Sequence, residues 1–198
     1  MLRALLLAPP GAGKGTQGQR LAGIYGVPHL ATGDLLRQHV AEGTALGAEA
    51  KGYMERGELV PDKIVTSLVL NRLTGGKPLR GFILDGFPRS LRQAEDSYEW
   101  GQGRGLTFHR VISLAVDEDE LVRRLLDRGR RSRRSDDNEE TIRKRLRVYE
   151  ETTRPLLDFY RQRSILAEID GTGPVDEVTD RIRAALDPVV SGDQSAPT

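Results

Sequence analysis

The sequence contains no cysteine, and only three of its 198 residues are histidine. The absence of cysteine excludes disulfide bonds and cysteine-ligated zinc, and the wide spacing of the histidines argues against a histidine metal site. No apolar run approaches the roughly 18 residues that cross a membrane, and the apolar opening of the chain is too short for a signal peptide. We therefore expect a soluble, cytoplasmic protein with no membrane partner.

An excess of one charge is also missing. Charged residues make up 30% of the chain, but the net charge is only +1. Without a strong positive field, the sequence does not indicate a nucleic-acid partner. Lysine is scarce, so arginine carries nearly all of the positive charge. The many arginines reflect either the base composition of the genome or the recognition of anions, for which the guanidinium fork is well suited. The position of each arginine must decide between these two explanations.

Short apolar segments alternate with segments of helical character. Buried strands are predicted near residues 2–7, 81–85, 109–116 and 164–171. Helices are predicted near residues 15–25, 61–73, 90–100, 118–128 and 174–187. Two more helices are expected after an N-cap at Thr32 and after a capping box of Asp137 and Glu140, and Asp187-Pro188 is expected to end the last helix. This alternation predicts an α/β fold with a mostly parallel sheet.

The segment ALLLAPPGAGKGTQ joins the first predicted strand to the first predicted helix. It departs from the phosphate-loop pattern G-x-x-x-x-G-K-[ST] at Ala8 and Gly15. Gly11, Gly13 and Gly15 let backbone N–H groups approach a phosphate, and Lys14 supplies a point charge. An ordinary glycine-rich turn is the alternative, and GTPases, ATPases and small-molecule kinases share the motif. We expect Ala8 to have a negative φ and to leave the loop intact.

The second functional element is an acidic residue in the segment FILDGFPR. Asp85 ends a buried strand, where a carboxylate can orient Mg²⁺ or its waters beside a phosphate loop. A turn-capping role before Gly86 is the alternative. Pro88 fixes the backbone, so Arg89 is expected to project from the sheet edge at which α/β proteins bind ligands.

Seven motifs in order carry a family resemblance: PPGAGKGTQ, TGDLLR, GELVPD, GFILDGFPR followed by Gln93, RLLDRG, DDNEETIRKRL and DGTGPVDEV. Together they resemble the adenylate kinase family of nucleoside monophosphate kinases, in its short-lid form. The resemblance implies one kinase domain over residues 1–187 with a P-loop NTPase-like parallel sheet flanked by helices. Within it, the core would comprise 1–30, 62–128 and 138–187, a helical NMP-binding insertion 31–61, and the lid 129–137. Residues 188–198 would form a disordered tail.

The resemblance also implies roles for individual residues. ATP would contact Gly11, Ala12, Gly13, Lys14, Gly15, Thr16, Arg128 and Gly173. AMP would contact Thr32, Arg37, Met54, Glu58, Leu59, Val60, Gly86, Phe87, Pro88, Arg89, Gln93, Arg134 and Arg145. The catalytic cations would be Lys14, Arg89, Arg128, Arg134 and Arg145. Asp85 would reach Mg²⁺ through water, no zinc is expected, and the Gln93 amide would pair with the adenine edge.

The resemblance implies the reaction of MgATP with AMP to give two ADP. Several alternatives stay open. A UMP/CMP or broad-specificity monophosphate kinase would share most of these motifs. A catalytically dead regulator should have lost Lys14, Asp85 or one of the arginines implied above, and none of these is missing. A GTPase would need an N-K-x-D segment, which is not found. The additional arginines Arg130, Arg131 and Arg133 form either a solvated loop or an attractor for polyphosphate. A monomer is expected.

Overall fold

We analysed a computed structural model that describes residues 1–75, 79, 81–132 and 136–192 of the chain. In this part of the chain, five parallel strands form one sheet in the order β2-β3-β1-β4-β5. The strands are β1 (Arg3–Leu7), β2 (His29–Ala31), β3 (Phe82–Asp85), β4 (Arg110–Ala115) and β5 (Leu166–Asp170). The α/β prediction and the parallel sheet are confirmed. The short strand β2 is not among the predicted strands, because three residues carry too little periodic signal.

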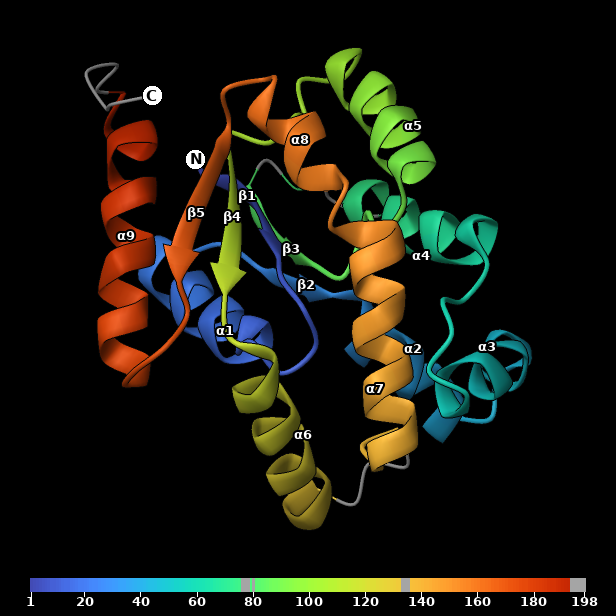
Figure 1. Cartoon of the computed structure of the whole chain (residues 1–198). Coiled ribbons are helices and arrows are strands. Elements are labelled where there is room, and N and C mark those ends of the chain that lie inside the picture. The colour runs from blue at the N-terminus through green and yellow to red at the C-terminus, as the bar shows by residue number, and fades with distance from the viewer. Residues whose placement is uncertain (76–78, 80, 133–135, 193–198) are drawn as a thin grey trace.

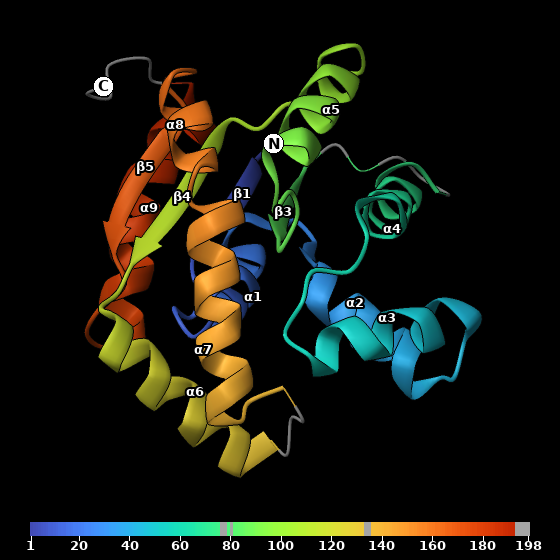
Figure 2. The ribbon, with the colours of Figure 1, turned by 45° about the vertical axis from the view of Figure 1, so that its right-hand side comes forward.

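The sheet is covered by helices on both faces (Figures 1 and 2). The elements that follow the first half of the sheet are α1 (Lys14–Tyr25), α2 (Thr32–Ala41), α3 (Ala45–Glu55), α4 (Asp62–Thr74) and α5 (Leu91–Gln102). Those of the second half are α6 (Glu118–Ser132), α7 (Glu139–Val148), the π-helical turn η1 (Tyr149–Thr153), α8 (Leu156–Arg161) and α9 (Val175–Ser191). None of the described helices is long and apolar enough to cross a membrane.

Two hydrophobic clusters lie on the two faces of the sheet. One contains Leu6 and Ile112 and packs against α1, α6, α7 and α9. The other contains Leu5 and Val111 and packs against α2, α3, α4, α5 and α8. Successive residues of β1 therefore point to opposite clusters, which explains why this strand is a continuous apolar run.

Strand β1 lies between β3 and β4, with Leu5 in register with Leu84 on one side and Val111 on the other. The chain moves from β1 outward to β2 and β3 on one side and later to β4 and β5 on the other. The carboxyl end of β1 is therefore a switch point of the sheet, and ligands of open α/β sheets bind at such points.

Three details of the helix ends differ from the sequence predictions. Thr32 is the first residue of α2 rather than its N-cap, which is Ala31. Asn138 rather than Asp137 caps α7, because its side chain accepts from Thr141 N. Helix α6 continues past residue 128 to Ser132, and Gly129 lets α7 approach it, since a Cβ there would lie 2.7 Å from the carbonyl oxygen of Asp137.

The final helix also differs, because Pro188 does not end it. Helix α9 runs to Ser191 and is closed by Gly192 at φ 74°. Proline removes one intrahelical hydrogen bond this close to the helix end, and Val189 of the same turn packs against the core. Residues 188–192 of the predicted disordered tail are therefore ordered, and the rest of that tail lies outside the described residues.

Candidate active site

A cleft of about 880 Å³ opens at the carboxyl ends of β1 and β3. Of the predicted site residues, the cleft is lined by Gly11, Ala12, Gly13, Lys14, Gly15, Thr16, Thr32, Arg37, Met54, Glu58, Leu59, Val60, Asp85, Gly86, Pro88, Arg89, Gln93, Arg128, Arg145 and Gly173. Phe87 does not line it, because the residue is only 2% exposed and belongs to the hydrophobic core. Arg134 lies outside the described residues.

The glycine-rich loop keeps the conformation of a phosphate cradle. Gly11 and Gly13 have φ values of 89° and 95°, which residues with a Cβ rarely adopt. Ser164 is the non-glycine residue with positive φ in the described part of the chain, so the negative φ predicted for Ala8 is confirmed. Among the described residues, no side chain caps the start of α1, so its first N–H groups are available to an anion.

Lys14 extends back over this loop. Its Nζ donates to the carbonyl oxygens of Ala8 at 2.6 Å and Pro9 at 3.0 Å. Burial lowers the pKa of Lys14 to about 8, while Asp85 raises the pKa and Arg89 lowers it further. The ammonium is thus placed where a phosphate would restore a favourable charge environment.

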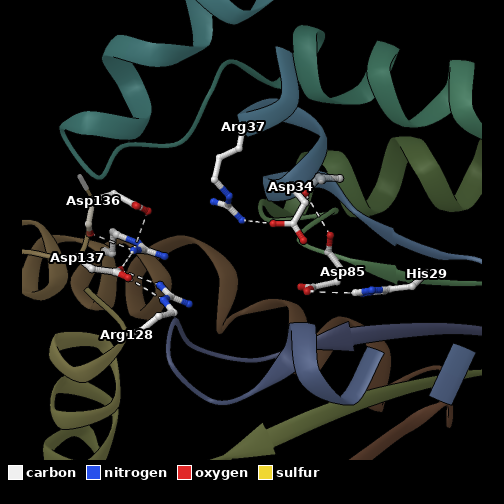
Figure 3. A network of polar contacts seen from close by, with 9 residues as sticks. His29, Asp34, Arg37, Asp85, Arg128, Asp136 and Asp137 are labelled. Atoms are coloured by element: carbon white, nitrogen blue, oxygen red, sulfur yellow. Dashed lines mark hydrogen bonds and ion pairs between the residues drawn. The ribbon is translucent and has the colours of Figure 1, made fainter. Parts of the chain in front are cut away.

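Asp85 is the last residue of β3 and is in register with Leu6 of β1, so it lies beside the start of the loop (Figure 3). Its backbone carbonyl accepts from Thr32 Oγ1 at 3.2 Å, and its Oδ2 lies 3.9 Å from Nε2 of the largely buried His29. In the described part of the chain, no three acidic or histidine side chains gather as a metal site. Mg²⁺ is commonly held by one or two carboxylates together with substrate phosphates and waters, so a single Asp85 fits an ion carried by the nucleotide.

The arginines of the cleft fall into two groups. Arg128 and Arg145 both bind Asp137, whose side chain is fully buried, with Arg128 Nε 2.6 Å from Oδ2 and Arg145 Nη1 3.0 Å from Oδ1. Arg145 also binds Asp136 at 2.9 Å, and these contacts are drawn in Figure 3. Two aspartates thus gather two arginines from α6 and α7 at one point of the cleft.

Arg89 and Arg37 form the second group, on the side of α2. Arg37 Nη2 donates to Asp34 Oδ1 at 2.5 Å, whereas Arg89 Nε donates to the carbonyl oxygen of Gly86 at 2.8 Å. Burial lowers the pKa of Arg89, Asp85 raises it, and Arg145 and Arg37 lower it. A cation in this position favours an anionic ligand.

A family model described as adenylate kinase matches residues 6–165. The chain belongs to the adenylate kinase family. It is 51% identical to an adenylate kinase of Thermobifida fusca (strain YX), over 93% of this chain and 98% of that protein. It is 46% identical to an adenylate kinase of Trichodesmium erythraeum (strain IMS101), over 96% of this chain and 100% of that protein. The adenylate kinase resemblance predicted from the seven motifs is thereby confirmed.

The predicted pocket for the AMP base forms another part of the cleft of this adenylate kinase family member. Met54 and the predicted backbone segment 58–60 line it. Gln93 is 4% exposed, and its Oε1 accepts from Arg89 N at 2.8 Å while its Nε2 donates to Asp62 Oδ1 at 2.6 Å. Gln93 thus lines the cleft and is not an exposed helix residue, and its bond to the adenine edge stays a prediction.

Several cleft residues were not among the predicted site residues. They include Gln19, Asp34, Glu120, Arg123, Arg131, Asp136 and Tyr149. Asp34 and Asp136 lie inside the quoted motifs TGDLLR and DDNEETIRKRL. A cluster of arginines needs carboxylates nearby, and this requirement could have identified both residues. Glu120 and Tyr149 carry no such signal, because only the packing of α6 and η1 brings them to the cleft.

Proposed function

We propose that the chain catalyses the reversible transfer of the terminal phosphoryl group of MgATP to AMP, which gives two molecules of ADP. The observation that carries this proposal is the convergence of Lys14, Arg37, Arg89, Arg128 and Arg145 on one cleft. Phosphoryl transfer requires mainly that the reactants are positioned and that charge on the transferred group is neutralised. Converging cations perform both tasks without a nucleophilic side chain.

In this proposal, the loop of residues 11–16 holds the ATP phosphates through backbone N–H groups and the Lys14 ammonium. The Lys14 ammonium exchanges its bonds to backbone carbonyl oxygens for bonds to phosphate oxygens. Arg37 and Arg89 hold the phosphate of AMP, and Arg128 and Arg145 hold the group being transferred. Bound Mg²⁺ would neutralise phosphate charge, and Asp85 would orient its water ligands.

AMP is favoured as the acceptor because Gln93 lies buried at the base pocket with both ends of its amide hydrogen-bonded. An amide offers a donor and an acceptor to the adenine edge. A site that depends on such bonds rejects bases with a different pattern, since a mismatch leaves buried polar groups unpaired.

The test is an assay of ADP formation with MgATP against AMP, UMP, CMP and GMP in turn. We expect AMP to give the highest kcat/KM, and a Lys14→Met variant to lose activity with every acceptor. A higher kcat/KM for UMP or CMP than for AMP would replace this proposal with a pyrimidine monophosphate kinase. Inactivity of the folded protein with all four acceptors would favour a nucleotide-binding regulator.

We also propose that residues 31–61 form the AMP-binding insertion, that residues 129–137 form the lid, and that the protein is a cytoplasmic monomer. In support, α2 and α3 follow the edge strand β2 and lie together beside the sheet (Figure 2). Among the described residues, the exposed large apolar side chains Ile24, Leu91 and Val190 come from three different helices, and Val175 lies at the opposite end of α9 from Val190. Stable interfaces, in contrast, need contiguous apolar patches. Light scattering coupled to gel filtration tests the monomer, and hydrogen exchange with AMP bound should slow chiefly in residues 31–61.

A further inference from the structure

The side-chain amide of Gln93 is hydrogen-bonded at its oxygen by a donor and at its nitrogen by an acceptor. Its Oε1 accepts from the backbone N–H of Arg89 at 2.8 Å, and its Nε2 donates to Asp62 Oδ1 at 2.6 Å. The remaining oxygen of Asp62, Oδ2, accepts from Ser90 Oγ at 3.1 Å. Gln93 lines the cleft, whereas Asp62 does not, so Gln93 connects Asp62 to a bound base.

Two helix starts bring these residues together. Asp62 is in the first turn of α4, where the helix dipole favours a carboxylate. Ser90 is the N-cap of α5, and its Oγ accepts from Gln93 N at 3.3 Å. The carboxylate of Asp62 is therefore fixed in place by its own helix and by the cap of the next one.

These two anchors allow the Gln93 amide one orientation. If the amide turned by half a rotation, its NH₂ group would face the N–H of Arg89 and its oxygen would face the carboxylate of Asp62. One contact would then place two donors together and the other two acceptors together. Buried polar groups without hydrogen-bond partners are strongly disfavoured. The observed orientation uses one N–H and one lone pair, so one donor and one acceptor remain for a ligand, in a fixed order.

We propose that Asp62 is a positioning residue that fixes the order of donor and acceptor which Gln93 presents to the base of the acceptor nucleotide. Adenine offers a ring nitrogen acceptor beside an amine donor. Hypoxanthine has nearly the same shape but offers a ring N–H donor beside a carbonyl acceptor. Asp62 therefore selects AMP over IMP without touching either one. This inference rests on the proposed function.

The variant Asp62→Asn tests the role with little change in shape. An asparagine amide can donate or accept toward Gln93, so the turned Gln93 loses only its bond to Arg89 N. We expect the ratio of kcat/KM for AMP to kcat/KM for IMP to fall about tenfold, a loss on the scale of one specific hydrogen bond. The change should be in the KM of the monophosphate, with the KM of ATP within about twofold of the original.

The matched control is Asp96→Asn. Asp96 is on α5, the helix that carries Gln93, and its substitution removes the same charge as Asp62→Asn. Its side chain, however, is 70% exposed and lies outside the cleft. We expect this variant to keep the AMP to IMP ratio of the original protein. An equal loss of kcat/KM for AMP and IMP in Asp62→Asn would overturn the inference, because it would indicate a general structural role. An unchanged ratio would overturn it as well.

A second measurement needs no activity, and it separates this inference from the proposed function. In ¹⁵N-labelled protein without nucleotide, the Gln93 side-chain NH₂ should exchange slowly with water, and Asp62→Asn should accelerate this exchange. Rapid exchange in the original protein overturns the inference, whether or not AMP is a substrate and whether or not the variant folds. Slow exchange together with a preference for UMP overturns only the proposed function and leaves the anchoring of Gln93 by Asp62 supported.

Discussion

The affinity for ATP should depend on pH through one side chain of the phosphate loop. Burial lowers the pKa of Lys14 to about 8, and among its charged neighbours Asp85 raises the pKa while Arg89, Arg145 and Arg128 lower it. A bound polyphosphate stabilises the ammonium form and raises this pKa. Binding of ATP above pH 8 must therefore be accompanied by the uptake of a proton.

The sign and the size of the effect follow from this shift. Below pH 8, the lysine of the nucleotide-free protein is already charged, so ATP binds with full affinity. At pH 9, about one tenth of the molecules carry the ammonium, and the Kd for ATP should be about tenfold larger than at pH 7, or about 1.4 kcal/mol. Phosphate groups ionise near pH 6, so the interval from pH 7 to 9 reports mainly on the protein.

The shift has a second consequence, for the stability of the nucleotide-free protein. The folded pKa of Lys14 lies below its ordinary value of 10.5. The unfolded chain therefore binds more protons between about pH 8 and pH 10.5, and the contribution of this group to stability rises with pH across that window. ATP affinity and intrinsic stability should thus change in opposite directions as the pH increases from 8 to 10.

Isothermal titration calorimetry with ATP from pH 7 to pH 9 measures the effect. Lys14→Met should weaken binding at pH 7 and remove the pH dependence. Lys51→Met is the matched control, because the Lys51 side chain is 59% exposed on α3 and lies outside the cleft. A change of less than about twofold in the Kd of the original protein, or a flat profile in Lys51→Met, would refute the reasoning.

Three further outcomes are expected. Gly11→Ala should lower the free energy of unfolding by about 1 kcal/mol or more in urea titrations, because its φ is 89° and its Cβ would lie 3.0 Å from Leu121 O; unchanged stability would contradict this. Asp137→Ala should cost about 2 kcal/mol in the same titrations, since its two arginines would lose a fully buried partner; a cost below 0.5 kcal/mol would count against the ion-pair argument. Arg131→Gln should raise the KM of ATP at low salt more than Arg130→Gln does, because Arg131 lines the cleft and Arg130 does not; equal effects would favour a solvated loop.

The sequence predicted the sheet and the loop well, because their signals are local. Apolar runs such as Leu2–Leu7 mark buried parallel strands, and the glycines around Lys14 leave few alternatives to a phosphate cradle. Helix ends were predicted less well. Pro188 can be tolerated because Val189 still packs against the core, and a local pattern does not contain such tertiary contacts.

The site shows the same division between local and tertiary information. Arg89 and Gln93 were placed in the site from one motif, and the structure brings both to the cleft. The partner of Gln93, Asp62, is 31 residues away along the chain, and nothing near either residue predicts their contact. Asp137 was predicted to begin a helix, but its carboxylate instead binds two arginines. The two partly buried cations require a counter-charge, and α7 is already capped by Asn138.

The carboxylates of the cleft also determine what a phosphate must displace. Arg128 and Arg145 are held by Asp137, whereas Arg89 forms no ion pair with a carboxylate in the described part of the chain and donates to the Gly86 carbonyl. A phosphate at Arg89 gains a charge-assisted bond without breaking one, so this position should bind tightly. At the other two arginines, phosphate must compete with a carboxylate of similar geometry, so the exchange is nearly balanced. Under the proposed function, this balance would keep the transferred group from being held so tightly that it leaves slowly in either direction.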